Sequence, residues 1–115
     1  MTSSELELEV RDDDGAIIIA AKGELDMTSA DSFAGELERA TQAHPQLIVL
    51  DFSFLQFIDS SGLAALVKAQ QEAQASGRAL VIVRGPHQVE QLLELTGLAQ
   101  RMTIVDSLAE ARRTR

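Results

Sequence analysis

The sequence has 115 residues, 45% of them apolar and 24% charged, proportions typical of a single compact globular domain. It contains no cysteine, which excludes disulfides, thiolate metal ligands and a cysteine nucleophile. The formal net charge of −8 opposes binding to nucleic acid or to an anionic membrane, because both attract basic surfaces.

The chain begins MTSSELELEV, which contains neither the basic nor the apolar segment of a secretory signal. No apolar run is long enough to cross a bilayer. We therefore expect a cytoplasmic protein with one domain over residues 1–115.

Two strands open the predicted fold. Residues 5–10, ELELEV, alternate polar and apolar, which predicts a strand with one buried face. Residues 11–15, RDDDG, predict a turn, because Asp-Gly is a favoured hairpin dipeptide. Residues 16–21, AIIIAA, predict an antiparallel partner strand that is buried on both faces, since the run does not alternate.

A helix and a third strand follow. Thr28 and Ser29 are candidate N-caps for a helix that ends before Pro45. Apolar residues recur there at three- and four-residue spacing, at Ala30, Phe33, Ala34, Leu37 and Ala40. LIVLDF, residues 47–52, predicts the next buried strand.

The second half of the chain continues the alternation of helices and strands. FIDSSGL, residues 57–63, predicts a loop that leads into a helix with Leu63, Leu66 and Val67 inward, closed by Gly77. The remaining elements are a strand at 79–83, a helix after Pro86 that ends at Gly97, a strand at 102–105, and a helix at 108–113 capped by Asp106 or Ser107.

This order predicts an α/β fold with a mixed, mostly parallel sheet of about five strands, helices packed on it, and an N-terminal antiparallel hairpin. In such sheets, functional residues gather beyond the carboxyl ends of the strands. Asp26, Asp59, Ser60 and Ser61 are predicted to lie there.

The two adjacent serines need an explanation. One hydroxyl can cap the helix by accepting a hydrogen bond from a free N–H group of its first turn. The second is surplus to that task. A helix N-terminus also stabilises a phosphate, so a phosphoserine at this position could act as a switch for binding.

Other chemistries fit the sequence poorly. A serine hydrolase needs a histidine base, and both His44 and His87 are predicted to face solvent in loops. FIDSSGL also lacks the flanking glycines of a nucleophile elbow. The run Asp12–Asp14 lacks the ligand spacing of a calcium loop, and no phosphate-binding glycine motif is present. We expect no cofactor and no metal.

Three stretches resemble the STAS domain family, and within it the stand-alone anti-sigma factor antagonists of bacteria. These are GELDMTSA (residues 23–30), LIVLDFSFLQFIDSSGLAAL (47–66) and LLELTGLAQRMTIVDSLAEA (92–111). They occur in the family's order, with similar spacing, and span most of the chain. The D-S-S-G-L element with its preceding strand is the specific part.

The resemblance implies a non-enzymatic phosphoprotein that regulates transcription by partner switching. Ser61 matches the phosphoacceptor of the family. The unphosphorylated antagonist would sequester an anti-sigma factor with a GHKL-type serine kinase fold, and so free the sigma factor. Phosphorylation would release the antagonist, and a metal-dependent serine phosphatase would reset it.

The resemblance also implies roles for the neighbouring residues. Ser60 would cap the helix while Ser61 presents its hydroxyl to the ATP of the partner, and Asp59 would fix the helix start. Asp26 would lie close by, and Gly62 would leave room for another chain. As turn and cap residues, Asp26 and Asp59 have an equally good local explanation.

The sequence departs from the family pattern at Phe54 and Gln56, just before the serines. Phe54 is interpreted either as core or as an exposed anchor that sets partner choice. An alternative function is a non-phosphorylated STAS interaction module in a stress-signalling or lipid-transport assembly. A nucleotide-binding sensor and a domain of an anion transporter are less well supported, because phosphate loops and membrane segments are missing.

Overall fold

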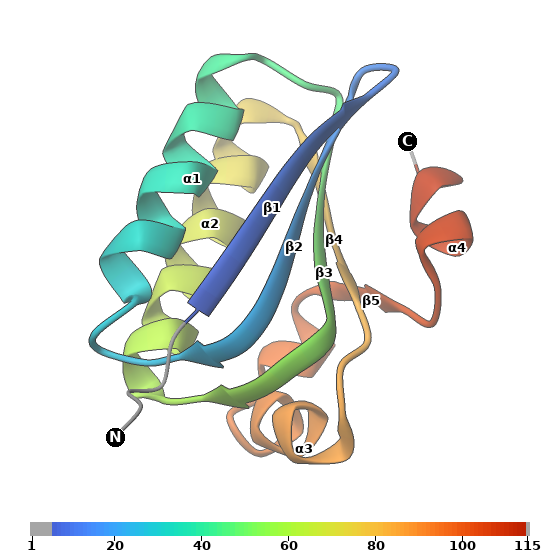
Figure 1. Ribbon diagram of the computed structural model, residues 1–115. Coiled ribbons are helices and arrows are strands. Elements are labelled where there is room, and N and C mark those ends of the chain that lie inside the picture. Colours follow the sequence, from blue (N-terminus) through green and yellow to red (C-terminus); the bar gives the residue numbers. More distant parts are fainter. Residues whose placement is uncertain (1–5, 115) are drawn as a thin grey trace.

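The structure, a computed structural model, describes residues 6–114 (Figure 1). A short 3-10 helix, Leu98–Gln100, precedes the last strand. The other elements in chain order are β1 (Leu6–Asp13), β2 (Ala16–Leu25), α1 (Ala30–Gln42), β3 (Leu47–Ile58), α2 (Ser60–Ser76), β4 (Ala79–Val83), α3 (His87–Leu95), β5 (Thr103–Val105) and α4 (Leu108–Arg112).

The five strands form one sheet in the order β1-β2-β3-β4-β5. β1 and β2 pair antiparallel, and the other three pairs are parallel. Figure 1 shows α1 and α2 on one face of the sheet, α4 on the opposite face, and α3 near the end at which β2 and β3 finish. The predicted α/β fold, with its mixed sheet and antiparallel hairpin, is confirmed.

The two faces of the sheet carry separate hydrophobic cores. The larger core lies between the sheet and the helices α1, α2 and α3, and includes Phe33, Phe52 and Leu66. The smaller core lies under α4 and includes Ile18 and Val49. Alternate residues of β2 and β3 serve the two cores. Residues 16–19 and 47–50 are buried on both faces, as predicted, whereas Ala20 and Asp51 of the predicted runs AIIIAA and LIVLDF are only partly buried.

Three strands are longer than the sequence predicts. β1 continues to Asp13, so the turn is only Asp14 and Gly15, which have φ values of 54° and 88°. β2 continues to Leu25 and β3 to Ile58. In β3 the pairing with β2 shifts register twice, each time because β3 has one extra residue. These bulges break the two-residue alternation, so the sequence gives little sign of a strand there.

The helix ends follow the predictions more closely. Gly77 and Gly97 both have left-handed backbone conformations, with φ values of 71° and 81°, as their predicted cap positions require. The hydroxyl of Ser107 accepts a hydrogen bond from the N–H group of Glu110, which confirms Ser107 as the cap of α4. Short-range signals therefore located these three helix ends correctly.

Candidate functional site

The carboxyl ends of β2 and β3 lie side by side and build the candidate site. Leu25 pairs with Ile58, and the N–H group of Asp59 donates to the carbonyl oxygen of Leu25 at 3.1 Å. Asp26 and Asp59, one residue further on, therefore leave the sheet next to each other. The structure brings these two predicted acids together, as the parallel pairing of the strands requires.

Asp59 caps helix α2. Its Oδ1 atom accepts hydrogen bonds from the N–H groups of Ser61, at 2.8 Å, and Gly62, at 3.2 Å. The prediction that Ser60 is the cap is therefore wrong. The reason is backbone conformation: Asp59 is extended, as an N-cap must be, whereas Ser60 already belongs to the helix.

Both serine hydroxyls are left without a structural task. Ser60 is exposed and Ser61 is half-buried, at the first two positions of α2. Within residues 6–114, no hydrogen bond involves the hydroxyl of either serine. The helix dipole also makes the potential positive at this end, which favours an anionic group. The Ser61 hydroxyl can therefore react without breaking an existing contact.

Gly62 is buried against the chain's own strand ends. A Cβ atom at this position would lie 2.7 Å from Cγ1 of Ile58 and 2.9 Å from the carbonyl oxygen of Leu25. Any side chain would push α2 away from the sheet. Gly62 thus permits the close approach of α2 to the ends of β2 and β3 in the same chain. The expectation that it leaves room for another chain is not met.

Asp26 organises the loop between β2 and α1. Its Oδ1 atom accepts hydrogen bonds from the N–H group and the hydroxyl of Thr28, at 3.0 and 2.7 Å. Ser29 occupies the N-cap position of α1, but its hydroxyl donates to the carbonyl oxygen of Glu24 and accepts from the N–H group of Asp26. Ser29 therefore ties the loop to β2 and does not cap the helix through its side chain.

Phe54 lies apart from this cluster. It belongs to β3 and not to a loop, it pairs with Lys22, and it is 70% exposed. This excludes the core interpretation of Phe54 and leaves the interpretation as an exposed anchor. Of the six predicted partner-binding residues, the structure brings together Asp26, Asp59, Ser60, Ser61 and Gly62, and places Phe54 elsewhere.

Two exposed apolar side chains near the site were not predicted. Met27, next to Asp26, is 75% exposed, and Phe57 is exposed two residues before Asp59. Residues at or just after the end of a strand are usually polar, so apolar residues at these two positions could have indicated an exposed apolar surface. They add exposed apolar area at the strand ends that carry Asp26 and Asp59, and such area suits a protein-binding surface.

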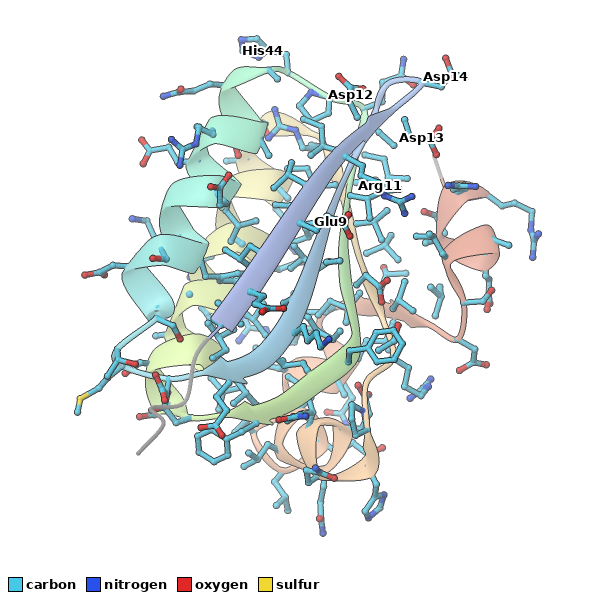
Figure 2. The ribbon with its side chains drawn as sticks, viewed as in Figure 1. Glu9, Arg11, Asp12, Asp13, Asp14 and His44 are labelled. Carbon is cyan, nitrogen blue, oxygen red and sulfur yellow. The ribbon has the colours of Figure 1, made fainter. Side chains whose placement is uncertain are left out.

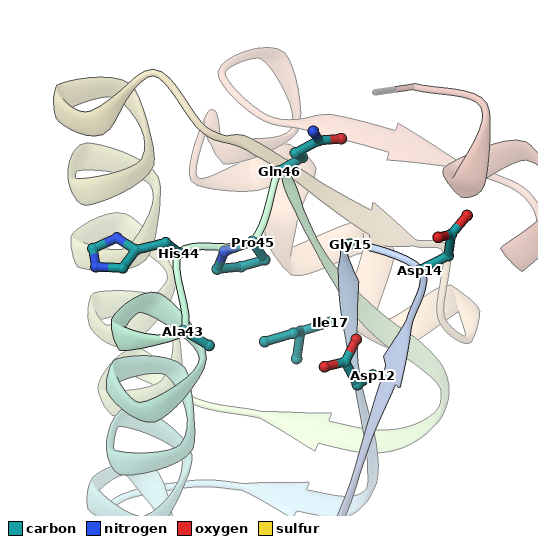
Figure 3. A pocket seen from close by; sticks show the side chains of 8 residues that line it. All are labelled: Asp12, Asp14, Gly15, Ile17, Ala43, His44, Pro45 and Gln46. Atoms are coloured by element: carbon teal, nitrogen blue, oxygen red, sulfur yellow. The ribbon is translucent and has the colours of Figure 1, made fainter.

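The histidines offer no base for Ser61. His44 follows the end of α1, on the opposite side of the molecule from the start of α2 (Figure 2). There it lines a hollow of about 540 Å³ with Asp12, Asp14 and Gln46 (Figure 3). His87 is exposed at the start of α3. Within the described residues, no group of three or more His, Asp or Glu side chains is arranged to hold a metal ion.

A separate polar network follows β4. Arg84 Nε lies 2.7 Å from Asp106 Oδ1, and its Nη1 atom lies 3.3 Å from Glu90. The hydrogen bond to Asp106 raises the pKa of Arg84, and both carboxylates add to this effect. Glu90 also accepts from the N–H group of Gly85. The network joins β4, α3 and the segment before α4, and its groups are paired with one another.

A sequence model of the STAS domain matches residues 7–111, so the chain belongs to the STAS domain family. The chain is also similar to the anti-sigma F factor antagonist of Paenibacillus polymyxa, with 30% identity over 92% of each chain. The resemblance seen in the three sequence stretches is thereby confirmed.

Solved structures agree on the fold. An anti-sigma factor antagonist from Mycobacterium paratuberculosis superposes with a TM-score of 0.83 at 24% identity, over 95% of this chain and 92% of that one. The Bacillus cell fate determinant SpoIIAA in its phosphorylated form gives a TM-score of 0.72 at 21% identity, over 96% and 100%. In the part of the chain that the structure describes, no helix has the length and apolarity needed to span a membrane.

Proposed function

We propose that the protein is an anti-sigma factor antagonist controlled by phosphorylation of Ser61. The unphosphorylated form binds and sequesters an anti-sigma factor, and phosphorylation releases it. The observation that carries this proposal is the position of the Ser61 hydroxyl: it lies at the N-terminus of α2, accessible and unbonded, beside a capping carboxylate that already holds the helix. The names of the relatives support the same role.

The fold can accept the modification. The hydroxyl oxygen of Ser61 attacks the γ-phosphorus of ATP bound to the partner, the bond to the bridging oxygen breaks, and ADP leaves. The hydroxyl proton passes to a base of the kinase or to water. The product carries about −1.5 to −2 charges, which the helix N-terminus favours. The native state of the antagonist is therefore kept.

The docking surface responds differently. The surface formed by Asp26, Met27, Phe57, Asp59 and Ser61 is here called the Ser61 rim. A phosphate on Ser61 adds negative charge next to Asp59 and close to Asp26, on a surface where Met27 and Phe57 offer apolar contact. A partner that packs on this rim would have to remove water from the phosphate, and its own carboxylates would be repelled. The modification thus opposes binding while leaving the fold intact.

The proposed partners follow from this cycle. The anti-sigma factor has a GHKL-type fold and acts as the serine kinase, and a metal-dependent serine phosphatase removes the phosphate. The antagonist is a substrate and binding protein and not an enzyme, and it acts in the cytoplasm, where transcription takes place.

Phosphopeptide mapping of the protein from its own host, in resting and stressed cells, tests the proposal. Cleavage after Arg39 and Lys68 gives one peptide that contains Ser53, Ser60 and Ser61. We expect phosphate on Ser61, with an occupancy that changes between conditions. The variant Ser61→Ala should lose the phosphate, and the matched control Ser60→Ala should keep it.

Phosphate on Ser60 or Ser53 in place of Ser61 would contradict the assignment. Its absence from all three serines under every condition would favour the alternative function, a non-phosphorylated STAS interaction module in a stress-signalling or lipid-transport assembly.

A further inference from the structure

The α4 face of the sheet is covered along only part of its length. Ile18 and Val49 are buried there, in the smaller core beneath α4. The next two rows across β1, β2 and β3 are Glu9–Ala20–Asp51 and Glu7–Lys22–Phe54. Among residues 6–114, no helix packs over these two rows.

These rows form a groove of about 480 Å³, here called the open-face groove. Ala20 stands between two longer side chains, those of Glu9 and Asp51, so the middle of its row is hollow. Figure 2 shows Glu9 on the α4 side of β1. The residues of the groove that carry the argument are Glu7, Glu9, Ala20, Lys22, Asp51 and Phe54.

A bulge in β3 turns Phe54 toward the groove. Strict alternation from Phe52, which is in the larger core, would place residue 54 in that core as well. Because β3 has an extra residue between Asp51 and Phe54, the alternation is reset, and Phe54 pairs with Lys22 on the open face. Bulges often redirect a side chain toward a functional surface.

The charge of the groove is mostly negative. Glu7, Glu9 and Asp51 contribute three carboxylates, and Lys22 contributes one ammonium group. Within the described part of the chain, none of the four ion pairs involves Glu7, Glu9 or Lys22. Asp51 is engaged only locally, with the N–H group and hydroxyl of Ser53. An exposed phenyl ring is thus surrounded by carboxylates that lack ion-pair partners.

We propose that the open-face groove is a second docking surface, which binds a basic segment of a partner protein through one apolar anchor residue. The anchor would fill the hollow over Ala20 and pack on the ring of Phe54. Lys or Arg side chains on either side of the anchor would pair with Glu7, Glu9 and Asp51. This surface is separate from the Ser61 rim and goes beyond the proposed function.

Charge complementarity selects this occupant over others. A second copy of the chain would bring the same carboxylates and a further net charge of −8, so two copies repel each other at this face. Nucleic acid and anionic membranes are repelled for the same reason. A segment with basic flanks satisfies the carboxylates, and burial of the anchor supplies the hydrophobic contribution.

The test is selection from a displayed library of random short peptides on the purified full-length protein, with counter-selection on the variant Phe54→Ser. We expect enriched peptides in which an aromatic or aliphatic residue lies between Lys or Arg residues. A synthetic peptide with the enriched sequence is then titrated into isotope-labelled protein, and the amide shifts are followed by NMR. The largest shifts should fall in β1, β2 and β3 at the two rows of the groove.

Matched variants separate this binding from general stickiness. Phe54→Ser should raise the Kd of the peptide at least about tenfold, as loss of a central anchor does, whereas Leu95→Ser, at a residue 76% exposed on α3, should leave it unchanged. Glu9→Lys should weaken binding and reduce its salt dependence more than Glu38→Lys, an equal charge change on α1. Ser61→Ala should have no effect, so the two proposals can fail independently.

Several outcomes would overturn the proposal. The selection could yield no peptide that binds the parent protein more tightly than the Phe54→Ser variant. It could also yield acidic or uncharged peptides, or the NMR amide shifts could be confined to the Ser61 rim. Because Phe54 and Glu9 are both exposed, their variants should unfold at the same temperature as the parent protein, and a thermal melt verifies this.

Discussion

The two faces of the sheet differ in how much of them the fold uses. On the α1 and α2 face, buried residues of β2 and β3 continue to the ends of both strands, at Leu25 and Ile58, and Gly62 has no room for even one more carbon atom. On the α4 face, burial stops after Ile18 and Val49, and an exposed phenylalanine follows. The first face carries the larger core, whereas the second is left uncovered, within the described residues, at the rows that follow Ile18 and Val49.

The difference shows why stability and binding can be separated in this chain. The rim with Ser61 lies at the end of the densely packed face, so the serine is carried by a rigid helix start. The open-face groove lies on strands whose opposite side is already anchored. Changes at exposed groove residues should therefore affect binding without affecting folding, and changes in the larger core should do the reverse.

The largest expected effect contrasts two phenylalanines of β3. Phe52 is fully buried and its ring centroid lies 6.2 Å from that of Phe33. Phe52→Ala should lower the free energy of unfolding by about 3–5 kcal/mol, because it removes apolar burial and leaves a cavity. Phe54→Ala, two positions further on, should change it by less than about 0.5 kcal/mol. Urea unfolding of both variants measures this, and similar losses would refute the difference between the faces.

Two glycines give the next contrast. Gly62→Ala should cost about 1–3 kcal/mol, since the carbonyl oxygen of Leu25 lies on the backbone and cannot yield as a flexible side chain would. Gly35, inside α1, has open space where a Cβ would be added, and Gly35→Ala should stabilise by about 0.5–1 kcal/mol through helix propensity. Thermal melts of the two variants should shift in opposite directions. Equal shifts would mean that α2 can move away from the sheet at little cost.

The cap of α2 should show an intermediate effect. Asp59→Ala removes the acceptor of two N–H groups and should cost about 1 kcal/mol. Asp59→Asn is the control, because asparagine caps helices equally well. A chemical denaturation series that includes Ser60→Ala assigns the cap: this variant should be close to the parent protein. A larger loss for Ser60→Ala than for Asp59→Ala would contradict the assignment.

The sequence predicted the elements whose periodicity is regular. Residues 16–19 and 47–50 are uninterrupted apolar runs, and the apolar face of α1 repeats at helical spacing, so the fold class followed from them. The second half of β3 escaped prediction because its two bulges place Leu55 and Ile58 in the core at a spacing of three. That spacing resembles neither a strand nor a polar loop.

The sequence predicted that Asp26 and Asp59 lie together, but it did not predict which residue caps α2 or where Phe54 lies. Asp26 and Asp59 meet because parallel strands end at one edge, which the alternation of strands and helices already implied. The choice between Asp59 and Ser60 as cap depends on where β3 ends, and local preference cannot decide it because both residue types cap well. The separation of Phe54 from the rim depends on a bulge that leaves no clear mark in the sequence. The role of Ser61 came from the family resemblance and stays a prediction.

The smallest expected effect concerns the ion pair that connects α4 to β1 at the edge of the smaller core. Arg112 Nε lies 2.8 Å from Asp13 Oδ2, and both side chains are half-exposed. This pair connects α4 to β1 across the edge of the smaller core, whose buried contribution from α4 is Ala111. A double-mutant cycle of Arg112→Ala and Asp13→Ala should give a coupling of about 0.2–1 kcal/mol, because water screens exposed charges.

Salt distinguishes this pair from the packing beneath it. The Debye length falls from about 10 Å at 0.1 M to about 3 Å at 1 M ionic strength, so the coupling should largely disappear at 1 M. The hydrophobic contact of Ala111 should persist under the same conditions. If the coupling exceeded about 1 kcal/mol and survived salt, α4 would be held chiefly by the ion pair. Burial of the smaller core would then follow from the docking of α4 and would not drive it. The packing of α4 on the sheet would in that case contribute less to the free energy of unfolding than its buried residues indicate.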